Sequence, residues 1–130
     1  ERFTISDKMW EGHQRRLSEH RKKGNGFGYS LFNGEDKYVN TISARYWKDG
    51  SEVLIEQEGR NPRVLTPREC ARIQGYPEIF QIHESKRHAY QQFGNSVAVP
   101  VISAIGGEIL RSLNEHKMAS ETDPLAPVIL

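Results

Sequence analysis

Apolar positions along this chain recur in patterns that predict four helices and one β-hairpin. The first helix follows Ser6, a residue type that caps helix N-termini, and it stops at Gly24 after a basic last turn. Its apolar positions form a narrow stripe that consists of Met9, Trp10, His13 and Leu17. Such a stripe predicts docking on one neighbouring element, with the opposite side left in water.

Two β-rich runs, TISARYW and SEVLIE, flank Lys48, Asp49 and Gly50 in the middle of the chain. Asp-Gly between such runs favours a tight hairpin turn, because its central residues take positive φ angles. We therefore predict a β-hairpin here. Alternation along its first strand places side chains on two faces: Ile42, Ala44 and Tyr46 on one, and Thr41, Ser43, Arg45 and Trp47 on the other.

The run LTPRECARIQGYP carries several helix-start and helix-stop signals. Thr66 and Glu69 match a capping box, Pro67 suits the first helical position, and Gly75 ends the helix after about two turns. A further short helix is predicted from Ser85 through KRHAYQQF. Gly94 is predicted to terminate it.

Ser96 is predicted to cap a final helix that holds Pro100 in its first turn, where the missing N–H does least harm. The apolar residues of this helix recur at four-residue spacing and form one apolar face, which is expected to pack into a hydrophobic core. They are Val97, Val101, Ile105, Ile109 and Leu113, joined by Ile102 and Leu110. The tail beyond Glu115 is predicted to be loosely ordered. Together these elements predict an α+β fold.

Composition allows one modest core. The chain has 130 residues, of which 36% are apolar and 27% charged, so it is polar for a self-contained domain. Either one face is extensively solvated, or part of the surface packs against a segment outside this chain. Its one cysteine, Cys70, excludes an internal disulfide and a multi-cysteine zinc site. Without a signal peptide or an apolar run of about 18 residues, we expect an intracellular protein away from membranes. Because the chain begins at Glu1 and not at methionine, further chemistry is expected upstream.

Charge points to a local basic surface, since the formal net charge is only +1. Basic residues cluster late in the first predicted helix, at Arg15, Arg16, Arg21, Lys22 and Lys23. The following loop, GNGFGYSLFNGED, sets three aromatic residues among glycines, which permit close approach of a ligand. Two interpretations stay open: a solvated helix beside a loop pinned by its aromatic rings, or a nucleic-acid surface.

Two longer runs resemble motifs of one enzyme family. RVLTPRECARIQGYPEIF, residues 63–80, resembles the ninth sequence motif of DNA (cytosine-5)-methyltransferases, and AYQQFGNSVAVPVISAIG, residues 89–106, resembles the tenth. NTISARY resembles the threonine-plus-aliphatic dipeptide in their target-recognition domain. The resemblance covers residues 8–113, and the subgroup that it favours methylates the inner cytosine of CCWGG sites.

The resemblance implies a C-terminal part of such an enzyme. Residues 1–62 would belong to the target-recognition domain, with a small hairpin-based sheet, and residues 63–115 would carry motifs IX and X. The final helix would belong to a Rossmann-like methyltransferase domain, and residues 116–130 would form the loose tail. The family's glycine-rich loop for S-adenosylmethionine and its catalytic Pro-Cys dipeptide do not occur in this sequence. We therefore expect an inactive isolated chain, a cofactor bound mainly by the missing part, and no metal.

Cys70 is not expected to be the nucleophile of the family. It follows Glu69 instead of proline, and it lies within the predicted PRECAR helix beside Ala71 and Ile73. A cysteine in such a place is typically a small buried hydrophobe and not a thiolate.

Six residues are predicted to contact double-stranded DNA. Arg45, on the polar face of the predicted hairpin, is suited to guanine, although a salt bridge with Glu52 is an alternative. Thr41 matches the family's recognition threonine and suits a phosphate oxygen. The complete predicted set is Lys22, Lys23, Asn25, Thr41, Ser43 and Arg45.

Two further pairs have roles implied by the resemblance. Arg68 and Arg72 are predicted to brace the recognition domain against the catalytic part, and plain surface charge is the alternative. Asn95 and Ser96 follow Gly94 at the predicted start of the final helix, where free N–H groups suit an anion. Because the family places this turn beside the cofactor, Asn95 and Ser96 are predicted to contact the carboxylate end of S-adenosylmethionine.

Three functions compete. The chain is either the C-terminal portion or second subunit of a methyltransferase of a restriction-modification system, or a non-enzymatic DNA-binding specificity module. A helix-turn-helix regulator is disfavoured, because a proline and a polar loop follow PRECARIQGYP. The expected partners are DNA and an N-terminal catalytic part, and an uncovered apolar face would drive self-association. The expected location is the bacterial cytoplasm, at the nucleoid.

Overall fold

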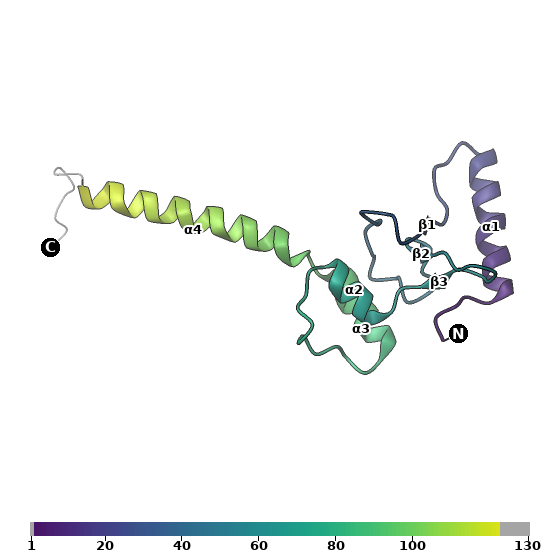
Figure 1. The fold of residues 1–130 in the computed structure, drawn as a ribbon. Coiled ribbons are helices and arrows are strands. Elements are labelled where there is room, and N and C mark those ends of the chain that lie inside the picture. The colour runs from purple at the N-terminus through teal and green to yellow at the C-terminus, as the bar shows by residue number, and fades with distance from the viewer. Residues whose placement is uncertain (1, 123–130) are drawn as a thin grey trace. The chain divides into compact units, whose positions relative to one another are not determined.

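Four helices and three short strands make up the described chain in a computed structural model, which covers residues 2–122 and their side chains up to Met118 (Figure 1). The helices are α1 (Asp7–Lys22), α2 (Pro67–Ile73), α3 (Lys86–Asn95) and α4 (Val99–Thr122). The strands are β1 (Leu31–Phe32), β2 (Leu54–Ile55) and β3 (Arg63–Val64). Two compact units are distinguished, Glu1–Ser96 and Val97–Leu130. The predicted α+β class is confirmed.

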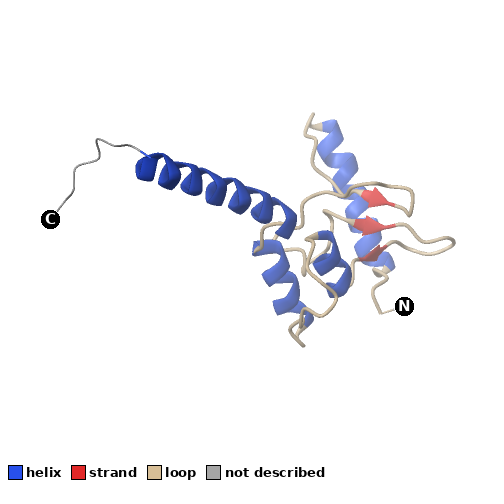
Figure 2. Cartoon of the chain, turned by 60° about the vertical axis from the view of Figure 1, so that its left-hand side comes forward, coloured by secondary structure: helices blue, strands red, loops and turns tan. Residues whose placement is uncertain are grey.

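The sheet lies in the first unit, with β2 in the centre (Figure 2). β1 runs parallel to β2, and β3 runs antiparallel to it, with Leu54 opposite both Leu31 and Val64. The N-terminal segment continues the sheet beyond β3, because Val64 N–H donates to the Phe3 carbonyl at 2.9 Å. The N-terminal segment and residues 63–64, far apart in the sequence, therefore meet at one small sheet.

The predicted hairpin around Asp49-Gly50 is wrong. Residues 41–53 contain no strand, and residues 44–49 form consecutive turns instead. Backbone hydrogen bonds close these turns, including Tyr46 N to Ser43 O at 3.0 Å and Gly50 N to Tyr46 O at 3.1 Å. We call residues 41–50 the turn segment. Only Gly50 takes a positive φ there, of 62°, so the two-residue hairpin geometry is not formed.

Local capping signals predicted the first two helices correctly. The Ser6 hydroxyl accepts from Met9 N at the start of α1, and Gly24 follows its end with a φ of 71°. The capping box of Thr66 and Glu69 is present at the start of α2. In both cases the stabilising hydrogen bonds join residues close in sequence.

The end of α3 differs from the prediction. The helix continues through Gly94 to Asn95, and Ser96 is its C-cap, with extended backbone angles. The assignment of Ser96 as the N-cap of the final helix is therefore wrong, since α4 begins only at Val99. Pro100 does lie in the first turn of α4, as predicted.

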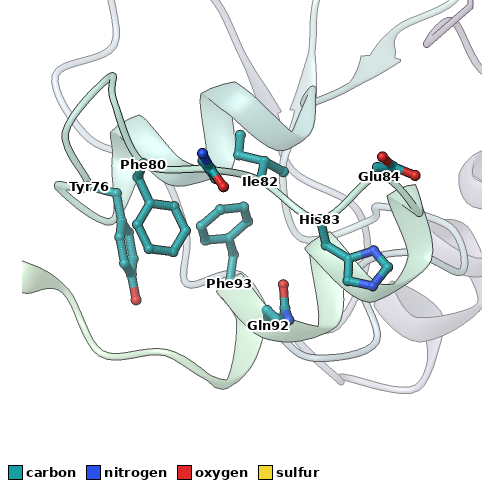
Figure 3. A pocket seen from close by; sticks show the side chains of 8 residues that line it. Tyr76, Phe80, Ile82, His83, Glu84, Gln92 and Phe93 are labelled. Carbon is teal, nitrogen blue, oxygen red and sulfur yellow. The ribbon is translucent and has the colours of Figure 1, made fainter.

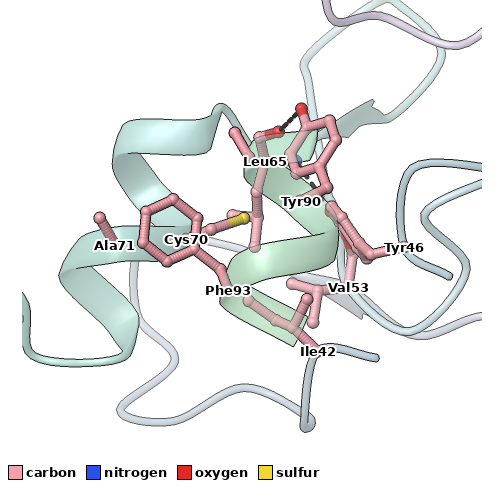
Figure 4. Packing of buried hydrophobic residues seen from close by; sticks show 9 residues of the cluster. Ile42, Tyr46, Val53, Leu65, Cys70, Ala71, Tyr90 and Phe93 are labelled. Atoms are coloured by element: carbon pink, nitrogen blue, oxygen red, sulfur yellow. Dashed lines mark hydrogen bonds between the residues drawn. The ribbon is translucent and has the colours of Figure 1, made fainter. Parts of the chain in front are cut away.

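The core of the first unit joins the turn segment to α2 and α3 (Figure 4). The Tyr46 hydroxyl accepts from Leu65 N at 2.8 Å and donates to Val53 O at 2.5 Å, while the Tyr90 hydroxyl donates to Leu65 O at 2.5 Å. The two tyrosine rings pack edge to face with centroids 5.4 Å apart. Burial raises the pKa of both phenols. Leu65 is thus held through both its backbone N–H and its carbonyl.

Most apolar side chains of α4 between Val99 and Met118 are exposed. They include Val101, Ile105 and Ile109, each with at least half of its surface exposed. α4 continues to Thr122, so residues 116–122 are helical, and the rest of the predicted tail lies outside the described residues. Contrary to our expectation, the stretch Lys86–Met118 contains an 18-residue window of mean hydropathy 1.4, which meets the length and composition of a membrane span.

Candidate functional site

A hydrogen-bonded clamp holds α1 against the turn segment. Arg16 donates to His13 Nδ1 at 2.8 Å and to Asp49 Oδ2 at 3.0 Å, while His13 Nε2 lies 3.2 Å from the Asp49 carbonyl. Because Arg16 can only donate, His13 Nδ1 accepts and its Nε2–H donates to Asp49. Burial lowers the pKa of His13, which favours this neutral form. Sequence reasoning counted His13 as apolar and missed its partner Asp49.

Most predicted DNA contacts lie at the surface. Lys22, Lys23, Asn25, Thr41 and Arg45 are all exposed.

Ser43 is the exception among the six, because it is half-buried. Its hydroxyl donates to Glu52 and accepts from Arg45 N at 3.2 Å, so it holds the turn segment in shape. No ion pair joins Arg45 to Glu52 among the described residues, so the salt-bridge alternative gains no support. The Arg45 guanidinium therefore lies in solvent.

A hollow of about 330 Å³ connects the second half of α1 to the glycine-rich loop and to Glu52. His20 lines it, and the Nδ1 atom of His20 is buried without a hydrogen-bond partner among the described residues. In the loop, Tyr29 packs edge to face on Trp10 at 4.8 Å and Phe32 packs on the core, whereas Phe27 is 73% exposed. Phe27 nevertheless packs edge to face on His20, with ring centroids 6.0 Å apart, so all three aromatic rings of the loop contact other parts of the unit.

Gly94 brings the turn segment directly against the end of α3. A Cβ atom at this position would lie 2.2 Å from Ser43 O and 2.4 Å from Ala44 N, distances that no side chain tolerates. Its φ is not in the left-handed region, so close approach and not backbone freedom requires glycine here. Gly94 is therefore a direct neighbour of Ser43 and Ala44, which no local sequence signal indicated.

Asn95 is exposed, whereas Ser96 is half-buried and bonded within α3. The Ser96 hydroxyl donates to Phe93 O at 2.8 Å, and the same carbonyl accepts from Gln74 Nε2 at 3.1 Å. Since these residues end α3 instead of starting α4, the helix dipole does not favour an anion at this turn. That part of the reasoning for a bound carboxylate was wrong.

Arg68 and Arg72 both contact the loop that follows α2. Arg72 makes a two-point ion pair with Glu78 at 2.6 and 3.1 Å, and its hydrogen bonds lower the pKa of Glu78. Arg68 donates to Phe80 O at 2.9 Å through one nitrogen, while its buried Nη1 has no partner among the described residues. Their predicted role in bracing a catalytic part stays a prediction.

An aromatic hollow of about 540 Å³ lies between α2, α3 and the loop that joins them (Figure 3). Tyr76 packs against Phe80 and Phe93 with ring centroids 4.6 and 5.4 Å apart. Beside it, Ile79 is 89% exposed. This region combines apolar surface with the polar groups of Gln92 and His83.

Cys70 is completely buried in the core, and burial raises the pKa of its thiol to about 12. A thiol in that state supplies almost no thiolate at neutral pH. The interpretation of Cys70 as a structural residue is confirmed. Among the described residues, no group of three or more His, Cys, Asp or Glu side chains is arranged to hold a metal ion.

The chain is similar to bacterial methyltransferases over most of its length. It is 59% identical to the Type II methyltransferase M1.ScrFI of Lactococcus lactis subsp. cremoris over 117 residues, which are 90% of this chain and 30% of that protein. It is 64% identical to the Type II methyltransferase M.DsaV of Dactylococcopsis salina, covering 93% of this chain and 34% of that protein. The chain thus spans about a third of these relatives.

Solved structures share the fold. The S. pombe Dnmt2 methyltransferase matches 87% of this chain with a TM-score of 0.68 at 17% identity, and the match covers 38% of that chain. The Entamoeba histolytica methyltransferase EhMeth matches 85% with a TM-score of 0.64. The sequence model of the C-5 cytosine-specific DNA methylases matches residues 1–111. This chain therefore belongs to the family of C-5 cytosine-specific DNA methylases.

Proposed function

We propose that this chain is the C-terminal, DNA-recognising and cofactor-closing part of a DNA (cytosine-5)-methyltransferase. The complete enzyme transfers the methyl group of S-adenosylmethionine to C5 of cytosine in a duplex site. Its nucleophilic cysteine comes from a segment outside residues 1–130, because Cys70 is buried and its pKa is raised. The enzyme acts in the bacterial cytoplasm, at the nucleoid, as part of a restriction-modification system.

The observation that carries the proposal is the packing of the Ser43–Ala44 backbone on Gly94. The turn segment resembles the family's recognition motif, and Gly94 to Ser96 resembles the turn that the family places at the cofactor. The turn segment and Gly94 lie in direct contact, and this contact is too tight for a Cβ atom at position 94. A target base and a methyl donor must meet within a few ångströms, so this contact suits the proposed role.

In this proposal, the exposed side of the turn segment faces DNA. Arg45 donates a two-point hydrogen bond to guanine O6 and N7, worth about 1–3 kcal/mol of discrimination. Thr41 binds a phosphate oxygen, and Ser43 shapes the turn through Glu52. Lys22, Lys23 and Asn25 add contacts that weaken with salt. Together these contacts offset the few kcal/mol needed to extrude the target base. The resemblance favours CCWGG as the target.

The cofactor would be held mainly by the missing segment, with Asn95 and, through its acceptor capacity alone, Ser96 as the contacts from this chain. S-adenosylmethionine supplies the activated methyl group when it is bound. The Asn95 amide is exposed and has both donor and acceptor capacity. The Ser96 hydroxyl fits less well, because its proton is donated to Phe93 O and only its acceptor capacity is left. Ser96 would thus accept from the cofactor's amino group rather than bind its carboxylate.

The missing segment would cover the apolar surfaces of this chain. The exposed face of α4 and the exposed Ile79 each offer it a contact. Because the family match continues through residue 111, we assign the apolar stretch of α4 to packing within the methylase and not to a membrane. An isolated chain would bury this face by self-association, and light scattering that shows a strict monomer at high concentration would contradict this.

Transfer of a radiolabelled methyl group into duplex DNA tests the proposed function. The chain alone is expected to transfer nothing, whereas the chain mixed with or joined to a Pro-Cys-containing segment is expected to methylate cytosine. An Asn95→Ala variant should raise the KM for S-adenosylmethionine more than the KM for DNA. If the complete protein binds its DNA site but never methylates it, the chain is a non-enzymatic specificity module and our proposal fails.

A further inference from the structure

Three segments far apart in sequence bring positive charges and aromatic rings together on the first unit. Lys86 at the start of α3 lies over the Phe3 ring, with Nζ 4.5 Å from the ring centroid. Arg87 and Lys48 both lie over Trp47, at 4.3 and 5.6 Å. With Arg2, these residues form what we call the second basic surface, which comprises Arg2, Phe3, Trp47, Lys48, Lys86 and Arg87. The rings hold the cations in place at the surface.

The cations of this surface are not neutralised. Elsewhere in the unit, two arginine side chains that pack against neighbouring segments are paired with carboxylates: Arg16 with Asp49 at 3.0 Å and Arg63 with Glu69 at 2.9 Å. No described acidic residue forms an ion pair with Arg2, Lys48, Lys86 or Arg87. Glu84 lies two residues before Lys86 and does not form one either. The surface therefore keeps its positive charge.

The placement of Lys86 and Arg87 opposes the stability of α3. They occupy its first turn, which contains no acidic residue, and the Ser85 side chain makes no capping hydrogen bond. Cations at a helix N-terminus repel the positive end of the helix dipole, whereas α1 and α2 follow the rule with Asp7 and Glu69. A local rule that is broken without compensation in the fold is expected at functional positions. An anion at this place would reverse the repulsion.

Between these residues lies a hollow of about 220 Å³. Its lining includes the cations Arg2, Lys48 and Lys86 together with the hydroxyl residues Thr4 and Ser6. Each hydroxyl accepts one hydrogen bond, Thr4 from Gln57 at 3.0 Å and Ser6 from Met9 at 3.3 Å, so its proton can be donated elsewhere. Asp49 also lines the hollow, but Arg16 pairs with it. The donors and charges match the needs of a phosphate group.

We propose that the second basic surface binds the phosphodiester backbone of the DNA substrate beside the base pairs that the turn segment reads. This inference rests on the proposed function. Lys48 and Trp47 belong to the turn segment that carries Arg45, so the second basic surface begins two or three residues along the chain from the side chain assigned to base reading. A backbone is preferred over a free phosphate because the cations come from three separate segments and extend beyond a single anion site. Such contacts give affinity without base specificity.

The test uses the complete methyltransferase, with DNA binding measured at several salt concentrations. Each lost phosphate contact lowers the slope of log K against log salt by about 0.9. Lys86→Gln should therefore lower the slope by about 0.9, and Lys48→Gln with Lys86→Gln by about 1.8, on target and non-target DNA alike. Lys37→Gln removes an exposed charge from a different hollow, the one beside Ile73, so it serves as the control and should leave the slope unchanged. Lys86→Arg keeps the positive charge, so it should keep the slope of the parent enzyme.

Two outcomes separate the possibilities. If inorganic phosphate binds to the parent enzyme and not to the double variant, while the salt slope for DNA stays the same, the surface is a free-phosphate site and the inference is overturned. If the double variant lowers affinity only for target DNA, the surface reads sequence and the inference is also overturned. In both cases Arg45→Gln still tests base discrimination, so failure here does not imply failure of the proposed function.

Discussion

Replacement of Tyr46 by phenylalanine should be the most informative test of how the turn segment is held. The Tyr46 hydroxyl is buried and makes two hydrogen bonds, from Leu65 N at 2.8 Å and to Val53 O at 2.5 Å. Tyr46→Phe leaves a buried N–H and a buried carbonyl without this partner, and Val53 and Leu65 are themselves buried. Water has no access through which it could replace the lost oxygen.

The magnitude follows from the two groups left unpaired. Each unsatisfied buried group costs about 1–3 kcal/mol, so Tyr46→Phe should lower the free energy of unfolding by about 2–6 kcal/mol. Tyr90→Phe is the matched comparison, because its hydroxyl is also buried and makes one hydrogen bond, to Leu65 O at 2.5 Å. It should cost about 1–3 kcal/mol, because one buried carbonyl loses its partner. For a domain whose total stability is about 5–15 kcal/mol, the difference between the two variants is large.

Urea unfolding followed by tryptophan fluorescence measures both variants. We expect the midpoint to fall more for Tyr46→Phe than for Tyr90→Phe, with the slope m unchanged. In the double variant the two effects should not add, because both hydroxyls bond the backbone of Leu65. A Tyr46→Phe variant as stable as Tyr90→Phe, or more stable, would refute the reasoning that the two hydrogen bonds of Tyr46 hold the turn segment to the start of α2.

Four other outcomes are expected. Gly94→Ala forces Ser43 and Ala44 away from α3, so it should lower the free energy of unfolding by about 1–3 kcal/mol. It should also raise the KM for DNA in the complete enzyme. Equal thermal stability of variant and parent would contradict the close contact. Because the folded pKa of His13 is lowered from its ordinary 6.5, its stabilising effect is present above pH 6.5 and is lost as the pH falls towards the lower folded pKa. Urea midpoints at about pH 7.5 and about pH 5.5 should therefore differ less in His13→Gln than in the parent, and an unchanged difference would argue against this source. Arg45→Gln should reduce discrimination between the target site and a site with one altered base pair by about 1–3 kcal/mol, measured by competition binding. Cys70→Ala should lower stability while the complete enzyme keeps methyl transfer at temperatures where it is folded; loss of transfer in a folded variant would show that the thiol has a chemical role.

Local hydrogen bonds made part of the fold predictable from the sequence. Ser6 caps α1, and Thr66 with Glu69 caps α2, and in each pair the bonded groups lie three residues apart. The ordered runs at residues 63–80 and 89–106 also identified the family, which the family match over residues 1–111 confirmed. These signals are contained in short stretches, so no knowledge of distant contacts was needed.

The turn segment shows why other elements were not predictable. Its alternating β-rich residues favour a strand and correctly group Ile42 with Tyr46, which are both buried, but the backbone folds into turns that bury the Tyr46 hydroxyl. The partners of that hydroxyl, Val53 and Leu65, are 7 and 19 residues away in the chain. Propensity is a weak preference, and two buried hydrogen bonds together with a filled core outweigh it.

The sequence by itself determined the helix starts, the family and the buried place of Cys70, because each of these depends on neighbouring residues or on their order. Only the tertiary structure decided that Gly94 lies against Ser43, that Asp49 binds His13 and Arg16, and that Lys48, Lys86 and Arg87 share one surface. The physical reason is that contacts between distant segments depend on how the whole core packs, and no short stretch of sequence contains that information.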